Sequence, residues 1–297
     1  MATAKPSESI PIPRLSYATK YRAMKITGRL VCTAVALLLF CVCISAAPPP
    51  RTKTRPVPPA AAAPTEKELE QYARALKKKN PVAAYAKLSA IATRKSSGVL
   101  GARAALALGY FDYNKANYAQ AAKWLDRSLA DPLLRDYSLY WSAETNIALA
   151  RNAEALAQLK QLRHDFPDSV ITDQALQSLG TAALALNQPG ESIAALDAYP
   201  ATNDKPGLLF LRAEARELAG QKSQAAADYQ AVYLRFALSD QSREAGMKLD
   251  YLRSSLGDQL PAIPLDQRLA HAATLFAAKQ WIEARMIGES LGSLFGH

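Results

Sequence analysis

Cysteine is scarce in this sequence, and its placement narrows the possible chemistry. The 297 residues contain three cysteines, and Cys32, Cys41 and Cys43 all lie in one apolar run near the N-terminus. Because none follows Cys43, the rest of the chain can form no disulfide and offers neither a thiol nucleophile nor a cysteine ligand for a metal. The scarcity is compatible with an oxidising compartment but does not require one.

Histidine is equally scarce. Only His164, His271 and His297 occur, and none has a second potential ligand at the spacing of a metal site. The sequence also lacks a glycine-rich phosphate loop, a nucleophile elbow and a paired-carboxylate signature. We therefore expect no metal, no cofactor and no catalytic residue, and predict that the protein is not an enzyme.

The net charge of +10 comes mostly from the N-terminal part of the chain. Residues 1–64 hold nine lysines and arginines against one acidic residue, whereas residues 65–297 hold 27 basic and 25 acidic residues. A balanced charge is poor evidence for binding to nucleic acid. We therefore interpret the basic excess as a targeting signature and expect no nucleic-acid partner.

An uncharged apolar run covers residues 30–47. As a helix it would reach about 27 Å, close to the ~30 Å hydrocarbon core of a bilayer. The basic segment 1–29 precedes it and should remain in the cytoplasm. The run is therefore either a transmembrane helix or the apolar region of a signal peptide.

Both fates of this run remain open from the sequence. Ser45, Ala46 and Ala47 are small residues of the kind that a signal peptidase reads, and Met24 begins a shorter segment with the features of a signal peptide. The protein is expected on the periplasmic side of the inner membrane if anchored, or soluble in the periplasm after cleavage near Ala47. Seven prolines in residues 48–64 predict an extended linker that spans roughly 50 Å.

Residues 65–297 contain pairs of small residues that lie twelve positions apart. Abundant alanine, with little valine, isoleucine or threonine, favours helices over strands. The pairs are Gly109 and Ala121, Ala143 and Ala155, Gly180 and Ser192, Ala213 and Ala225, and Ala272 and Ala284. The first four pairs start 34, 37 and 33 residues apart. A longer interval, with an extra helix and a loop at about 240–264, separates the last pair.

This pattern predicts antiparallel helix pairs. Small residues let two helices cross closely, and a bulky residue four positions later fills the flank in the first four pairs: Leu125, Leu159, Leu196 and Tyr229. A single pair cannot bury its apolar face, so neighbouring pairs should stack. The segment LGYFDYNKANYAQAAKWLDRSL from Leu108, with Tyr118 and Ala121, and the proline Pro167 between units resemble the tetratricopeptide repeat. The resemblance implies an all-α fold, an α-solenoid of helix pairs.

The order of the units is also similar to the N-terminal helical region of bacterial soluble lytic transglycosylases. That resemblance implies a scaffold near peptidoglycan. No lysozyme-like catalytic domain lies within the sequence, and it leaves open whether one is encoded downstream. An alternative interpretation is therefore that the chain is the N-terminal solenoid fragment of such an enzyme.

In the tetratricopeptide family, the first helix of each pair lines the concave face. Counted from the small residue, the candidate groove residues are Arg103, Tyr110, Tyr113, Asn114, Tyr137, Tyr140 and Glu144. Tyr110 and Tyr113, like Tyr137 and Tyr140, are three residues apart and therefore share a helix face. The four tyrosines are expected either to bind a partner or to pack between helices. The resulting hypothesis is a non-catalytic scaffold in the bacterial cell envelope that binds a protein or peptide, or peptidoglycan. Its partner and oligomeric state stay open.

Overall fold

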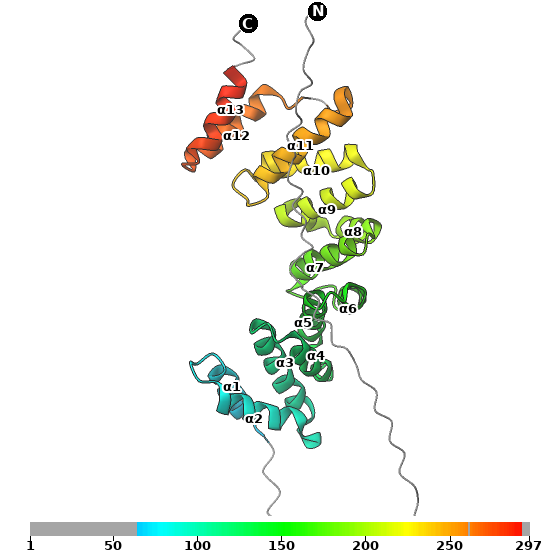
Figure 1. Ribbon diagram of the computed structural model, residues 1–297, viewed down its shortest axis with the longest axis vertical. Helices are drawn as coiled ribbons and strands as arrows, with labels where there is room; N and C mark the ends of the chain where they lie inside the picture. Colours follow the sequence, from blue (N-terminus) through cyan, green and yellow to red (C-terminus); the bar gives the residue numbers. More distant parts are fainter. Residues whose placement is uncertain (1–63, 261, 293–297) are drawn as a thin grey trace, which may run out of the picture. The chain divides into compact units, whose positions relative to one another are not determined.

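The computed structural model of the chain describes residues 64–260 and 262–292. These residues form α-helices joined by turns and short 3-10 helices, without a strand among them (Figure 1). All of them belong to one unit of the chain, Ala60–His297. The α-helices are α1 (Glu66–Ala75), α2 (Val82–Thr93), α3 (Gly98–Asn114), α4 (Tyr118–Ser128), α5 (Arg135–Ala148), α6 (Asn152–Asp165), α7 (Thr172–Ala185), α8 (Pro189–Asp197), α9 (Pro206–Leu218), α10 (Lys222–Arg235), α11 (Ser242–Leu256), α12 (Leu265–Ala277) and α13 (Trp281–Gly292). The 3-10 helices are η1 (Lys95–Ser97), η2 (Pro200–Asp204) and η3 (Gly257–Gln259).

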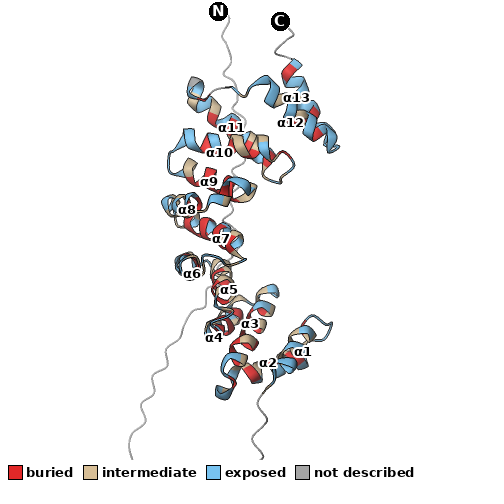
Figure 2. Cartoon of the chain, turned by 180° about the vertical axis from the view of Figure 1, so that it is seen from behind, coloured by how far each residue is buried: buried red, intermediate tan, exposed pale blue. Residues whose placement is uncertain are grey.

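The prediction of an all-α fold is confirmed for the described residues, and helices that are adjacent in the sequence pack together. Each of α4, α6, α8 and α10 lies against the helix before it and the helix after it. In addition, α3 contacts α5, α5 contacts α7, and α7 contacts α9. Buried residues recur along the helices from α2 to α11, and the exposed residues lie on the other sides of the same helices (Figure 2).

The pairs of small residues lie where consecutive helices meet. The first member of each pair is on α3, α5, α7, α9 or α12, and the second is on the next helix. Nine of the ten residues are buried, whereas Ala272 on α12 is only half-buried. The bulky residues that follow them, Leu125, Leu159, Leu196 and Tyr229, are fully buried.

Two glycines show how closely the helices approach. A Cβ atom at Gly109 would lie 2.6 Å from Cγ of Leu125 on α4. At Gly180 it would lie 2.9 Å from Oγ of Ser192 on α8 and 2.9 Å from Cγ of Leu211 on α9. Such distances are shorter than van der Waals contact, so any larger residue would force the helices apart.

The helix pairs close through one repeated backbone turn. Ala116, Ala150, Asn187, Gly220 and Lys279 all have a positive φ, between 55° and 76°, and each lies seven residues after the first small residue of its pair. In the first turn the N–H of Ala116 donates to the carbonyl of Tyr113 and the N–H of Asn117 to that of Asp112, both at 2.9 Å. The other four turns repeat both hydrogen bonds. This is the Schellman motif, which satisfies the last carbonyl groups of a helix.

The predictions for the N-terminal segment, the apolar run and the proline-rich linker fall on residues 1–63, outside the described residues. Within the described ranges, no helix combines the length and the apolar character needed to cross a bilayer. The extra helix expected at about 240–264 corresponds in position to α11 and η3, after which residues 262–264 lead into α12.

Candidate functional site

Four aromatic side chains from two helices form a cluster, which we call the aromatic patch. It consists of Tyr110 and Tyr113 on α3 and Tyr140 and Trp141 on α5. The Trp141 ring lies at the centre, with ring centroids 4.7 Å from Tyr110 and 5.1 Å from both Tyr113 and Tyr140. Tyr110 remains 44% exposed and the other three are half-buried. The patch therefore offers aromatic surface to solvent while its rings hold one another in place.

A carboxylate beside the patch connects it to a third helix. Oε2 of Glu144 on α5 accepts a hydrogen bond from the hydroxyl of Tyr113 at 3.2 Å. Its other oxygen accepts one from the hydroxyl of Ser178 on α7. Burial raises the pKa of Tyr113 to about 12, and the negative charge of Glu144 adds to this effect. The Tyr113 hydroxyl is therefore protonated at neutral pH and acts as a fixed hydrogen-bond donor.

The other candidate groove residues lie outside this cluster. Arg103 forms ion pairs with Glu66 and, at 2.9 Å, with the buried Asp131. The side-chain amide of Asn114 donates to the Tyr110 carbonyl at 2.7 Å and so stays within its own helix end. Tyr137 is half-buried and makes none of the ring contacts found among the described residues. The structure thus brings together Tyr110, Tyr113, Tyr140 and Glu144 of the seven.

Trp141 and Ser178 were not among the predicted residues. Both lie two positions before the small residue of their helix, Ala143 and Gly180 respectively. The inward-facing positions used for the prediction included the third residue before the small residue but not the second. A helix turns by about 100° per residue, so the neighbouring position reaches the same surface when its side chain is large. Including that position would have found Trp141, whereas Ser178 lies on α7, for which no groove residues were predicted.

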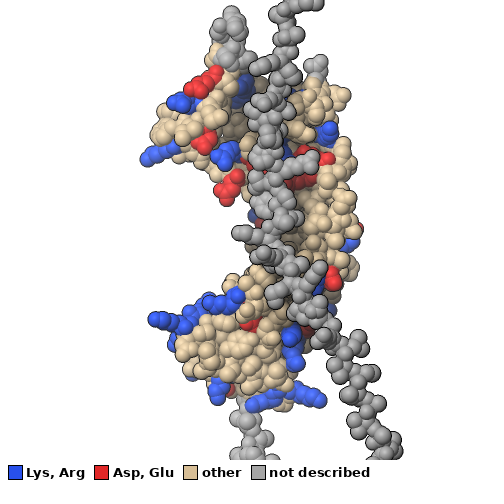
Figure 3. Space-filling view, in the orientation of Figure 1, with Lys and Arg blue, Asp and Glu red and all other residues tan. Residues whose placement is uncertain are grey.

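Basic side chains collect over α1 and α2 (Figure 3). The lysines at positions 77, 78, 79, 87 and 95 are exposed. Two arginines near them are paired, Arg74 with Glu70 and Arg103 with Glu66. This surface carries a positive charge and is separate from the aromatic patch.

A charge cluster in which Arg212 and Asp228 are buried and Asp197 is exposed joins α8, α9 and α10. The guanidinium of Arg212 forms two hydrogen bonds with the Asp228 carboxylate, at 2.9 and 2.8 Å, and a third with Asp197 at 3.1 Å. Arg216 also binds Asp228, at 2.7 Å, and Asp197, at 2.9 Å. Two cations and two anions neutralise each other here, so the cluster fastens three helices and leaves no charge for a ligand.

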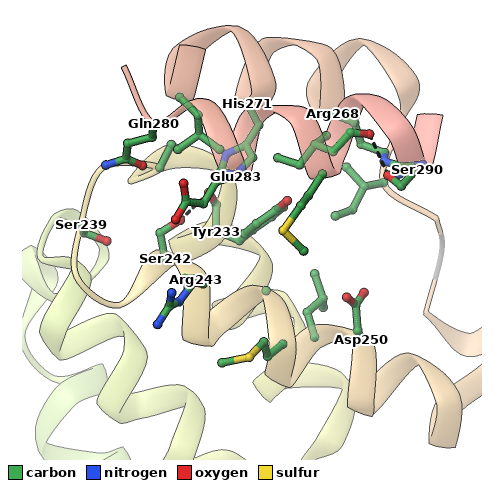
Figure 4. A pocket seen from close by; sticks show the side chains of 18 of the residues that line it. Tyr233, Ser239, Ser242, Arg243, Asp250, Arg268, His271, Gln280, Glu283 and Ser290 are labelled. Carbon is green, nitrogen blue, oxygen red and sulfur yellow. Dashed lines mark hydrogen bonds between the residues drawn. The ribbon is translucent and has the colours of Figure 1, made fainter. Parts of the chain in front are cut away.

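A cavity of about 800 Å³ lies between α11 and the pair α12–α13 (Figure 4). Tyr233 lines it, and its ring contacts that of His271 at a tilt of 41° with centroids 4.0 Å apart. His271 is buried, and its Nδ1 atom has no hydrogen-bond partner among the described residues. Burial lowers the pKa of His271, so its ring is neutral at neutral pH. The sequence prediction had no signal for this cavity, because it placed only an extra helix and a loop there.

The sequence contains three histidines, and none of them was predicted to bind a metal. His271 lines the cavity, His164 is exposed beside Asp165 at 2.9 Å, and His297 lies outside the described residues. No group of three or more potential ligands that could hold a metal occurs in the part of the chain that the structure describes.

No protein-family model matches the chain, and the search of curated proteins found no similar sequence.

Proposed function

We propose that residues 65–297 form a tetratricopeptide-like α-solenoid that binds a peptide segment of a partner protein through the aromatic patch. Three observations support the solenoid. Small residues occur at helix crossings, the same backbone turn closes five helix pairs, and first helices contact one another across successive pairs. The family resemblance of the sequence points to the same arrangement.

The observation that carries the binding function is the composition of the patch. Tyr and Trp side chains provide large, rigid contact areas with a polar end, and they dominate the binding energy of many protein interfaces. Here Trp141 is held by three tyrosines, so little side-chain entropy would be lost on binding. Tyr110 is exposed enough to meet a partner directly.

The proposed scaffold acts without catalysis in the bacterial cell envelope, close to peptidoglycan. The location rests on the apolar run 30–47 and the proline-rich linker that follows it. The link to peptidoglycan rests on the order of the helical units. Both oxygens of Glu144, the acidic residue at the patch, are already hydrogen-bonded, which suits a structural acceptor better than a reacting acid.

The test compares two single tyrosine variants. Tyr110→Ala removes an exposed ring of the patch, and Tyr251→Ala removes a ring that is 66% exposed on α11. Peptides selected on the full chain from a random displayed library should bind Tyr110→Ala at least tenfold more weakly, a loss of about 1.4 kcal/mol. Their affinity for Tyr251→Ala should be unchanged, and both variants should keep the wild-type circular dichroism spectrum.

Three outcomes would count against the proposal. Equal peptide affinity for both variants would indicate that the aromatic patch serves only to pack helices together. If the chain retains purified peptidoglycan and no peptide is selected from the library, the partner is a glycan and not a peptide. Cleavage of peptidoglycan by the wild-type chain would refute the non-catalytic function.

A further inference from the structure

The helix α11 continues the series of first helices. Gly246 lies thirty-three residues after Ala213, the same interval that separates Ala213 from Gly180. A Cβ atom at Gly246 would lie 3.0 Å from the ring of Tyr233 on α10. Gly246 therefore allows a close helix crossing, as Gly109 and Gly180 do in earlier helices.

The surroundings of Gly246 differ from those of the earlier glycines in one respect. Gly109 and Gly180 each meet the helix that follows them, through Leu125 and Ser192. The atoms nearest to a Cβ at Gly246 belong to Tyr233, on the helix before it. After α11 the chain passes through η3, and α12 then packs against α13 and α10. Within the described fold, α11 therefore lies against α10 on one side and lines the cavity on the other.

The cavity face of α11 runs along most of the helix. Arg243, Met247, Asp250 and Arg253 recur every three or four residues and therefore share one side of it. The opposite wall comes from α12 and α13 (Figure 4). The α11 helix has 15 residues and is about 22 Å long, so the face suits an occupant of similar length. The second helices α6 and α10, with 14 residues each, have this length.

The walls of the cavity expose apolar side chains that the fold leaves uncovered. Met247 on α11 is 59% exposed and Met286 on α13 is 63% exposed. They are the only methionines after Met24, and both line the cavity. Methionine is flexible and polarisable, so it adapts to partners of varied shape.

Polar groups around the cavity need partners that the described residues do not supply. Arg253 binds Asp250 through Nη1 at 3.1 Å, but its Nε and Nη2 atoms are buried and have no acceptor among the described residues. Nδ1 of His271 is also buried and has no hydrogen-bond partner among the described residues. Because these atoms are buried within the fold itself, an occupant of the cavity meets Arg253 through the accessible part of its side chain, which is 34% exposed. Arg268, which donates to the Ser290 hydroxyl, and Arg243 also line the cavity, together with the acidic residues Asp240, Asp250 and Glu283.

We propose that this cavity binds an amphipathic α-helix of a partner protein, which packs on α11 as the second helix packs on the first in the preceding pairs. The occupant presents apolar residues at positions i, i+3 or i+4, and i+7 to Met247 and Met286. An acidic residue of that helix faces Arg253 and Arg268. This site is separate from the aromatic patch and does not depend on its function.

Two displayed libraries of 15-residue peptides test the proposal on the full chain. One library has a helix-forming framework with four randomised positions on one face, and the other has the same composition with prolines that prevent a helix. Only the helical library should be enriched. Enriched peptides should carry an acidic residue, and fluorescence anisotropy should give at least tenfold weaker binding to the Met247→Lys/Met286→Lys variant.

Two control variants keep the result interpretable. Arg253→Gln should weaken the binding of peptides with the acidic residue, and should not affect versions in which that residue is replaced by its amide. Tyr110→Ala should leave these affinities unchanged, because the aromatic patch is a different surface. Both methionines are exposed, so the lysine variant should keep the wild-type circular dichroism spectrum.

The following results would overturn the proposal. They are enrichment of the proline library, enrichment of neither library, or equal affinity of helical peptides for the lysine variant and the wild type. A dimer in analytical ultracentrifugation that the lysine substitutions dissolve would identify a second copy as the occupant, and would also overturn the assignment to a partner protein.

Discussion

Replacing Gly180 by alanine should destabilise the fold, although alanine is the better helix former. The added Cβ would lie 2.9 Å from Ser192 Oγ and 2.9 Å from Leu211 Cγ. Neither side chain has free space, because Ser192 is fully buried and Leu211 is 3% exposed. Overpacking of this kind costs about 3 kcal/mol at the upper end of its usual range. Alanine recovers about 1 kcal/mol through helix propensity, so the net loss should be about 2 kcal/mol.

Gly190→Ala is the matched control for this substitution. Gly190 lies on α8, the helix that packs on α7, and a Cβ there would meet no atom within 4 Å. Only helix propensity then changes, so the variant should gain up to about 1 kcal/mol. Urea unfolding followed by far-ultraviolet circular dichroism measures both values. If Gly180→Ala proves as stable as the wild type, the close crossing of α7 with α8 and α9 is wrong.

Three further predictions concern the turns, the charge cluster and the cavity. Ala150→Gly should stabilise the protein by about 0.5 kcal/mol, since Ala150 has a φ of 58°, and Gly220→Ala should cost about 1 kcal/mol at a φ of 76°; equal signs in urea unfolding would contradict the left-handed turns. Asp228→Ala should cost about 3 kcal/mol because it removes the main partner of the buried Arg212, and a loss below about 1 kcal/mol would contradict the pairing. Burial lowers the pKa of His271, so the unfolded chain binds its proton more readily than the folded chain. The free energy of unfolding should therefore be fully retained above about pH 6.5 and fall below it. His271→Leu should remove this fall, and an unchanged pH dependence would refute the role of His271.

The sequence contained enough information to predict the helix pairs. Pairs of small residues twelve positions apart placed each helix crossing, because close approach of two backbones excludes large side chains. The same pattern placed the turns, although the left-handed residue was not predictable from its type. Ala116, Ala150 and Lys279 occupy positions where glycine is usual. The packing of the helix pair therefore determines the turn at these positions, rather than the residue type.

Two parts of the candidate sites were not predictable in the same way. Trp141 was missed because its position was counted as facing another side of the helix. The cavity was missed because Gly246 has no small residue twelve positions later, where Asp258 stands. A search for pairs of small residues twelve positions apart does not detect a helix such as α11, which has no matching second helix. The departure from the pattern is the feature that leaves the α11 face open.

The C-terminal helix pair has consequences for the dynamics of the protein. Its own buried cluster contains only Ala237, Leu275 and Ala284, with Ile287 partly buried beside them. Phe276 and Trp281 contact each other but remain 62% and 53% exposed. A region with so little buried apolar surface opens at a lower free energy than the rest of a fold. Amide hydrogens of α12 and α13 should therefore exchange before those of α5 to α10. Since this pair forms one wall of the cavity, its local opening would change the width of the cavity.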